Sequence, residues 1–347
     1  MRWFALVCFL WAGNLLAQNI YTTQDRHSYD SLYYDKLPDA LTLKLLSFTK
    51  YSDFNLSDGA LHQTLNYEAH PGPSLGIGMH YKWLGLTFSM GYNAPGDTLY
   101  QRSQRFDFQT HLFLRRLTLQ FYSSGYSGYY LNETEKHIRN WPDGKLYPRS
   151  DIKTRNFGFN GFYIFNSGRF SNRAPSIYNE WQKKSAGSLV AGATLLYNQV
   201  KADSAIIPTN LLAIGYFNDT NFTYSDQFTV GGQVGYAFTL VLRQHFFVNF
   251  SILGGFSAGS TSMSLSDGES LKENRLNFVM SNSAGFGYNS RRFYAGFNYT
   301  NLVSDAPTPV QNTSIDYHAG KFQLAIAYRF TVPKHKSILP VWLPFEL

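Results

Sequence analysis

The chain has 347 residues, is 17% aromatic and carries a formal net charge of +7 at pH 7. Its 30 Lys and Arg residues are scattered along the chain, whereas a nucleic-acid binder would gather them in a patch. After residue 17 no apolar stretch reaches the roughly 18 residues that a membrane-spanning helix needs. The composition therefore argues against nucleic acid as a partner and against a helical membrane protein.

Residues 1–17 have the layout of a cleaved secretory signal peptide. A basic start at Arg2 precedes an apolar stretch from Trp3 to Ala12, and Ala17 supplies the small residue before cleavage. The only cysteine, Cys8, lies inside that stretch, so the mature chain would hold neither a disulfide nor a thiolate metal site. We expect an exported protein without a cofactor.

Residues 18–40 are polar and have no clear period, which predicts a segment in the periplasm or packed inside a lumen. Residues 41–45 alternate briefly and predict a possible strand. From residue 61 the alternation becomes regular. The predicted strands are 61–69, 75–83, 84–92, 104–114, 117–123, 151–165, 186–199, 226–240, 245–256, 274–288, 293–300 and 318–330.

The clearest pattern lies in residues 75–92, where large apolar residues such as Leu75, Ile77 and Met79 alternate with small or polar ones. Period-2 alternation predicts strands with two unlike faces. Runs of about nine residues match a tilted strand crossing a bilayer, which needs roughly 9–11. A secreted β-sandwich also alternates, but its strands average about 5–6 residues and lack aromatic girdles at their ends. The pattern favours a transmembrane barrel.

The predicted connections alternate between tight and long, as expected for short periplasmic turns and longer external loops. The long ones are 93–103, 124–150, 200–225, 257–273 and 301–317. We therefore predict an all-β, transmembrane antiparallel β-barrel over residues 41–330, with about 12 strands (10–14 possible), in the cell outer membrane. Residues 166–185 fall on the turn side yet are long, so they predict either a periplasmic connector or a hidden strand pair.

The alternating run from Phe322 to Phe330 has the form of a closing strand that the barrel-assembly machinery reads during insertion. A tail at 331–347 follows it and contains three prolines, so it cannot continue the strand. Ile338, Val341 and Trp342 make this tail apolar enough to dock on a partner, on the barrel rim or at the membrane interface.

Several short stretches resemble an uncharacterised family of outer-membrane β-barrels from Bacteroidota, known as a domain of unknown function. They are LTLKL at 41–45, LNY at 65–67, LGIG at 75–78, YKWLG at 81–85, QKKSAGS at 182–188 and AYRF at 327–330. The run at 182–188 is the most distinctive. The resemblance implies fold and location over about residues 37–330, and it carries no activity to this chain.

Polar residues that alternate with lipid-facing ones are the candidates for lumen chemistry. If Phe106 and Phe108 face lipid, their neighbours on the same strand face inward. The lumen candidates are His80, Lys82, Asp107, Gln109, His111 and Gln120. Such a set could form a proton relay, a metal site or a hydrolase constellation, but barrel interiors are polar and such groups often bond to one another. Because neither a nucleophile elbow nor metal-ligand spacing occurs, we expect no catalytic or metal site.

Residues 124–150 mix aromatic and charged side chains, and Tyr129, Tyr130 and Trp141 are candidates for recognition in an external loop. Together these features favour a non-enzymatic barrel that is a structural or partner-binding component of a cell-envelope complex. Its expected partners are outer-membrane lipid and a periplasmic or outer-membrane protein. The alternatives are a small-solute channel and an outer-membrane hydrolase that uses lumen or mouth residues such as His111.

Overall fold

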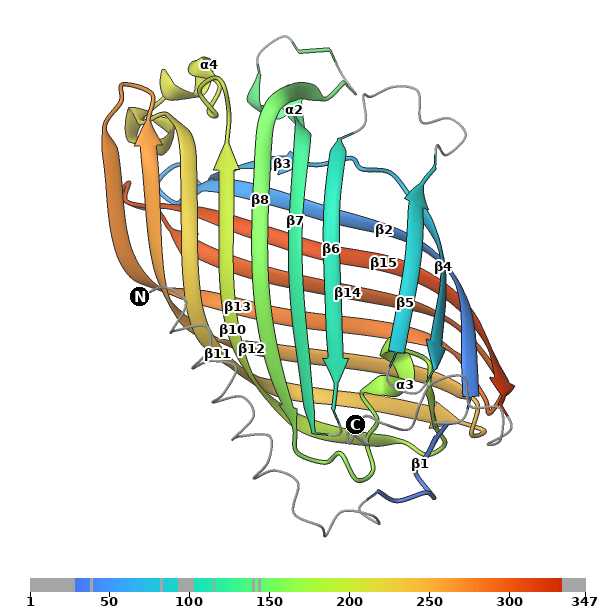
Figure 1. Cartoon of the computed structure of the whole chain (residues 1–347). Helices are drawn as coiled ribbons and strands as arrows, with labels where there is room; N and C mark the ends of the chain where they lie inside the picture. The colour runs from blue at the N-terminus through green and yellow to red at the C-terminus, as the bar shows by residue number, and fades with distance from the viewer. Residues whose placement is uncertain are drawn as a thin grey trace, which may run out of the picture.

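The computed structural model describes residues 29–37, 40–81, 84–92, 103–114, 116–138, 141–142 and 145–332. Over these residues an antiparallel sheet closes into a barrel, which confirms the predicted all-β class (Figure 1). The expected signal peptide, Lys82 and the tail residues Ile338, Val341 and Trp342 lie outside the described residues. No helix in the described part of the chain is both long and apolar enough to cross a membrane.

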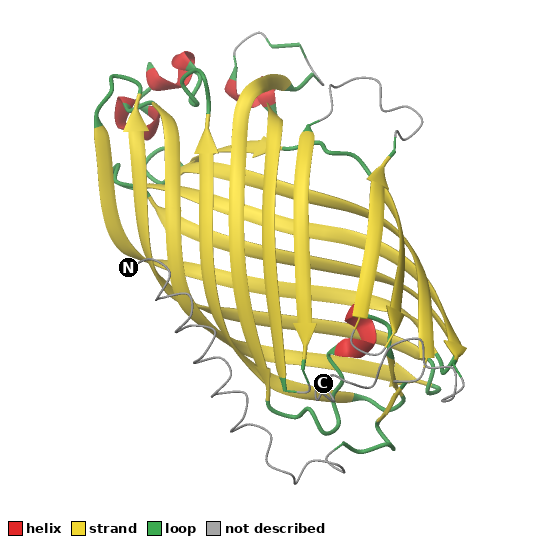
Figure 2. Cartoon of the chain, in the orientation of Figure 1, coloured by secondary structure: helices red, strands yellow, loops and turns green. Residues whose placement is uncertain are grey.

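The helices are single turns, and the strands are long (Figure 2). The strands are β1 (Tyr34–Lys36), β2 (Ala40–Asp58), β3 (Gln63–Glu68), β4 (Ser74–Tyr81), β5 (Leu84–Gly91), β6 (Gln104–Phe113), β7 (Leu117–Leu131), β8 (Tyr147–Ile164), β9 (Glu180–Gln182), β10 (Ala186–Lys201), β11 (Phe222–Leu242), β12 (Phe246–Leu265), β13 (Ser270–Asn289), β14 (Phe293–Pro307) and β15 (Thr313–Thr331). The helical turns are α2 (Thr134–His137), α3 (Arg173–Ser176), α4 (Thr209–Leu212) and the 3₁₀ turn η1 (Tyr216–Asp219). We call the end of the barrel that carries α2 and α4 in Figure 1 the upper end, and the end that carries α3 and β1 the lower end.

Backbone pairing closes a ring of ten strands, β2, β3, β7, β8 and β10 to β15. The ring closes where β15 pairs with β2 over their whole lengths, from Thr331 opposite Ala40 to Thr313 opposite Asp58. Three further strands attach to this ring: β4 pairs with β2, β5 with β4, and β6 with β7. The ring therefore has fewer strands than the twelve expected from the sequence.

The ring lacks β5 and β6 because these two strands do not pair with each other in the described residues. A second difference from the predicted strands is an interrupted strand. Both β3 and β4 pair with β2, β3 at residues 54–58 and β4 at residues 42–48 of β2. Between them lie Pro71, Gly72 and Pro73; prolines lack the N–H that a ladder needs, and Gly72 has a φ of 70°. The predicted strands 61–69 and 75–83 are thus two parts of one strand, and the doubtful strand at 41–45 is the beginning of the 19-residue β2.

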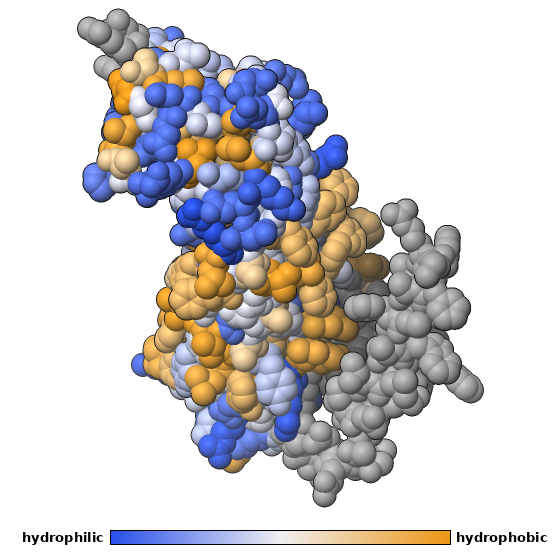
Figure 3. Space-filling model, turned by 90° about the vertical axis from the view of Figure 1, so that its left-hand side faces the viewer, coloured by the Kyte–Doolittle hydropathy of each residue, from blue (hydrophilic) through white to orange (hydrophobic). Residues whose placement is uncertain are grey.

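Outward-facing side chains form an apolar band around the wall of the barrel. Figure 3 shows hydrophobic residues gathered over the lower part of the wall, below a more hydrophilic upper part. Val234, Ile252 and Ile326 are 63%, 53% and 52% exposed, which is unfavourable in water and suited to lipid. Above this band the strands continue, so most of the predicted loops 257–273 and 301–317 are strand.

The upper end of the lumen is filled by the loop between β10 and β11, residues 202–221. Its Ile206, Tyr216 and Phe217 are fully buried in a core with inward side chains of β2, β3, β7, β8, β10, β11, β12 and β15. The loop backbone is held as well: the Ile206 carbonyl accepts hydrogen bonds from Tyr67 Oη at 2.6 Å and Arg149 Nη1 at 2.8 Å. Tyr216 Oη donates to the Leu56 carbonyl at 2.6 Å. This loop is therefore part of the barrel core.

The lower end is occupied by residues 166–185, which are a connector and not a hidden strand pair. The connector contains α3 and β9, and β9 pairs with β1 of the N-terminal segment. Its Tyr178 is 1% exposed, with its ring 4.2 Å from that of Tyr294. Arg329 on β15 donates from Nε to the Tyr178 carbonyl at 2.7 Å. The described part of the predicted N-terminal segment therefore packs on the connector.

Candidate functional site

A cavity of about 280 Å³ lies inside the barrel between the filled upper end and the connector. Four predicted lumen residues line it: Asp107, Gln109, His111 and Gln120. The alternation of β6 and β7 places them there, because their outward neighbours include Phe106 and Phe108, which are 65% and 51% exposed. Tyr126 lines the cavity next to the upper core, and Asn172 and Ser176 line it from the connector. The cavity is thus lined by wall and connector residues.

Two lysines that sequence reasoning did not select give the cavity its charge. Lys50 on β2 and Lys321 on β15 line the cavity and are directly opposed in the β2–β15 ladder. Like charges directly opposite each other in a sheet destabilise it. Lys50 forms an ion pair with Asp107, whereas Lys321 has no ion pair with any described residue. Lys321 could have been selected from its alternation with Phe322 and Leu324 in the closing strand.

The structure does not group His80 with the other lumen candidates. His80 is 7% exposed near the lower end, where its Nε2 lies 3.0 Å from Asn179 Nδ2 of the connector. Sequence alternation showed that His80 points inward, but it could not show which loop would cover it. His80 therefore belongs to the docking of the connector and not to the cavity.

His111 lacks the neighbours that a catalytic base would need in this arrangement. Its ring stacks on Phe113 with centroids 5.8 Å apart and makes no hydrogen bond to a described residue. A nucleophile and its base lie within about 2.6–3.2 Å of each other in known hydrolase sites. No described group of three or more His, Cys, Asp and Glu residues is arranged to hold a metal ion. The cavity geometry therefore favours binding over bond cleavage.

The aromatic residues predicted for an external loop lie mostly in strands. Tyr129 and Tyr130 belong to β7 and are 1% and 5% exposed. Tyr129 Oη donates to the Ser52 carbonyl at 3.0 Å, so this residue supports the wall beside the upper core. Trp141 lies beyond α2, where its ring packs edge-on against Tyr147 at 5.2 Å. Of these three residues, only Trp141 lies in a connection between strands.

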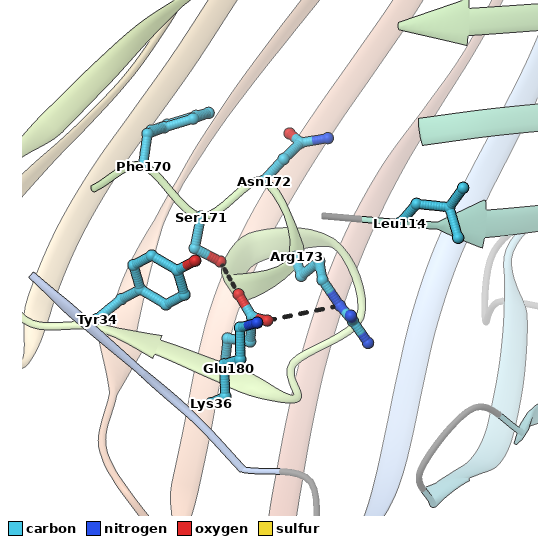
Figure 4. Close-up of a pocket in the computed structure, with 8 residues that line it drawn as sticks. All are labelled: Tyr34, Lys36, Leu114, Phe170, Ser171, Asn172, Arg173 and Glu180. Atoms are coloured by element: carbon cyan, nitrogen blue, oxygen red, sulfur yellow. Dashed lines mark hydrogen bonds and ion pairs between the residues drawn. The ribbon is translucent and has the colours of Figure 1, made fainter. Parts of the chain in front are cut away.

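The connector is built around buried polar side chains (Figure 4). Glu180 is 4% exposed, accepts a hydrogen bond from Ser171 Oγ and lies 3.7 Å from Arg173 Nε. Gln182, the first residue of the distinctive QKKSAGS run, accepts from the Ser171 backbone N–H at 2.8 Å and donates to the Arg169 carbonyl at 2.7 Å. Through these bonds Gln182 stabilises the fold of the connector.

Burial raises the pKa of Glu180, and the nearby Arg173 and the Ser171 hydroxyl offset this only in part. The folded connector therefore binds a proton that the unfolded chain releases above its ordinary pKa of 4.5, and stability falls as pH rises above that value. We expect Glu180→Gln to gain stability relative to wild type as the pH rises above 4.5, in a series of measurements from about pH 4 to pH 8. Urea unfolding of both proteins at each pH measures this. A constant difference across that range would contradict it.

The chain belongs to a family described as a domain of unknown function, DUF4421, whose model matches residues 28–330. A search of curated proteins finds no match to the chain.

The chain is similar in architecture to several solved structures. The outer membrane protease OmpT of Escherichia coli is 8% identical, with a TM-score of 0.41, over 85% of this chain and 98% of that one. The toluene transporter TodX of P. putida is 8% identical, with a TM-score of 0.24, over 85% and 91%. Ail of Yersinia pestis is 11% identical, with a TM-score of 0.24, over 83% and 99%. At these identities and scores the likenesses carry no functional argument.

Proposed function

We propose that this protein is a non-enzymatic barrel of the bacterial outer membrane, from a Bacteroidota envelope, that docks a periplasmic partner through its lower end. The observation that carries the proposal is the connector, which is fixed to the barrel by buried contacts of Tyr178 with Arg329 and of the Glu180 carbonyl with Asn289. Gln182 holds the fold of the connector itself. A segment held so firmly can present its outer side as a rigid surface. The filled upper end supports a binding role over that of an open solute channel.

The outer side of the connector has the character of a binding surface for an acidic protein. Leu32 of the N-terminal segment that packs on the connector is 64% exposed, and Arg169, whose Nε lies 3.9 Å from Asp30, has a side chain that is 59% exposed. The Lys184 ammonium lies 5.7 Å from the centre of the Tyr33 ring, beside Lys183, which pairs with Asp35 at 2.8 Å. Aromatic, apolar and basic groups side by side are typical of protein interfaces, where Arg and Tyr are enriched.

Site-specific photo-crosslinking in cells tests this surface. A photoreactive amino acid at Leu32 or Lys184 is expected to give one discrete cross-linked species of the same mass from both positions. The matched control is Gln311, an exposed position in the β14–β15 turn at the upper end, which should not give that species. Absence of any adduct at both lower positions, or the same adduct from Gln311, would contradict the proposed docking.

The proposal includes a closed barrel of twelve strands, in which β5 pairs with β6. Counting β3 and β4 as one interrupted strand, the twelve would be β2, β3 with β4, β5, β6, β7, β8 and β10 to β15. Unpaired edges in hydrocarbon cost several kcal/mol for each unsatisfied backbone group, which favours this pairing in a bilayer. An even strand number is also usual for single-chain bacterial barrels.

A further inference from the structure

The wall of the barrel has a seam between β5 and β6. In the described part of the chain β5 pairs only with β4, and β6 pairs only with β7. Most of the wall is joined by long ladders, such as the one between β11 and β12 from Phe222 to Leu242. Below the β3–β7 contact, the edges of β5 and β6 therefore face each other without a ladder.

Side chains hold β6 in place across this seam. Arg105 on β6 donates from Nη2 to Ser74 Oγ on β4 at 2.8 Å. Two residues further along β6, Asp107 pairs with Lys50 on β2. The partner residues are on β4 and β2, which lie beyond β5 in the strand order, so β6 is braced against the opposite side of the seam without backbone pairing to β5. Such bracing allows the seam to open or close while β6 stays attached to the barrel.

The seam borders the cavity directly, because Asp107, Gln109 and His111 of β6 line it. The two ends of the barrel offer no route into the cavity, because the upper core fills one end and the connector fills the other. A cavity of about 280 Å³ lies just below the range of roughly 300–1,000 Å³ usual for small-ligand sites. It can hold a head group and a short part of an acyl chain, and the remaining chain must leave through the seam.

The positive charge of the cavity favours binding of an anion. Lys50 and Lys321 face each other across the ladder, and Asp107 neutralises only one of them. An anionic group beside Lys321 would relieve their repulsion and form charge-assisted hydrogen bonds. Apolar wall residues, including Phe162, Ile164 and Leu253, line the same cavity and suit the first methylenes of a chain.

We propose that the β5–β6 seam is a lateral gate between the bilayer and the lumen, and that the cavity binds the anionic head group of a single-chain lipid. The head group lies between Lys50 and Lys321, and the acyl chain passes between β5 and β6 into the membrane. The head-group chemistry is shared by fatty-acid carboxylates and monoacyl phosphates. The gate and this site require no periplasmic partner, so the experiments below test them independently of the docking proposed above.

The closed gate has a predictable register. Directly opposed residues of an antiparallel pair face the same side of the sheet. The outward residues of β5 include Leu86 and Phe88, and those of β6 include Phe108. Phe108 therefore lies opposite an outward residue of β5 in the closed state, and Phe88 and Leu86 are the candidates in the middle of that strand. Directly opposed Cβ atoms about 4.5–5.5 Å apart are close to disulfide reach. These outward positions leave the inward lining of the cavity unchanged.

The experiment combines these cysteine pairs with binding of defined lipids by the purified full-length protein. Probes are oleate, a monoacyl phosphate and, as the neutral control, a monoacylglycerol, each measured by native mass spectrometry and tryptophan fluorescence. Phe108→Cys is paired with Phe88→Cys or Leu86→Cys, and each single-cysteine variant is its control. We expect oxidation to block binding of the anionic probes in at least one pair, and reduction to restore it.

The lysines are tested with the same probes. Lys321→Gln is expected to weaken binding of both anionic probes about tenfold or more, the loss expected for one charge-assisted bond. Lys272→Gln, which removes an exposed lysine near the upper end, should leave binding unchanged. Preference for oleate or for the phosphate identifies the source of the head group.

Several results would overturn the gate. One is equal binding of the monoacylglycerol, or no binding of either anionic probe to wild type. Another is unchanged binding in the cross-linked protein or in Lys321→Gln. Failure of the cysteine at Phe108 to cross-link with Phe88→Cys, with Leu86→Cys and, in the remaining register, with Met90→Cys would show that β5 and β6 do not close.

Discussion

Ile252→Arg is expected to destabilise the barrel by about 2–4 kcal/mol, because it places a charge against the hydrocarbon of the bilayer. Ile252 lies on β12, in the continuous part of the wall, and its side chain is 53% exposed on the outer face. Urea unfolding in lipid vesicles measures the change in the free energy of unfolding. The same residue exposed to water would tolerate arginine with little effect.

The matched control is the preceding residue, Ser251, whose side chain points into the cavity and bonds to Ser283 Oγ at 2.8 Å. Ser251→Arg introduces the same charge one position away, facing a polar lumen, and should cost clearly less. Equal losses at both positions would mean that the apolar band does not face lipid.

Arg329→Met is expected to cost about 3 kcal/mol or more and to release the connector. Arg329 is 2% exposed, and its guanidinium donates to the Tyr178 and Ser290 carbonyls and, at 3.0 Å, to Asn289 Oδ1. Each buried acceptor left without a donor costs about 1–3 kcal/mol. Limited trypsin cleavage after Lys183 or Lys184 reports release of the connector, and urea unfolding reports the loss of stability.

Arg292→Met is the control, since Arg292 lies in the turn between β13 and β14 at the lower end and is exposed. It removes an equal charge without breaking a buried contact, and should leave trypsin cleavage near the wild-type rate. Arg329→Met protein that resists trypsin as wild type does would show that the connector is not held by Arg329.

The sequence predicted those parts of the fold in which a strand has lipid on one face. Phe322 to Phe330 alternates without a break because lipid and lumen impose opposite demands on neighbouring residues. Residues 257–265 are equally regular strand, but above the apolar band their outward residues are polar, as at Ser260, Ser262 and Ser264. Their alternation in hydropathy disappears, which is why the long loops were predicted too long.

The candidate site was only partly predictable. The inward direction of Asp107, Gln109 and His111 follows from the period of one strand and needs no tertiary contact. The pairing of Lys50 with Lys321 depends on the register by which β15 closes onto β2, about 270 residues apart, and no local pattern encodes it. The place of His80 depends in the same way on the fold of a remote connector.

Conductance of the purified protein in a planar bilayer tests most directly whether the lumen is closed by the chain itself. The packed upper core and the docked connector predict no sustained current under either polarity, whereas an open porin measured in the same bilayer supplies the positive control. A stable, long-lived conductance of the wild-type protein would contradict the account, because it would require a continuous aqueous path through both ends.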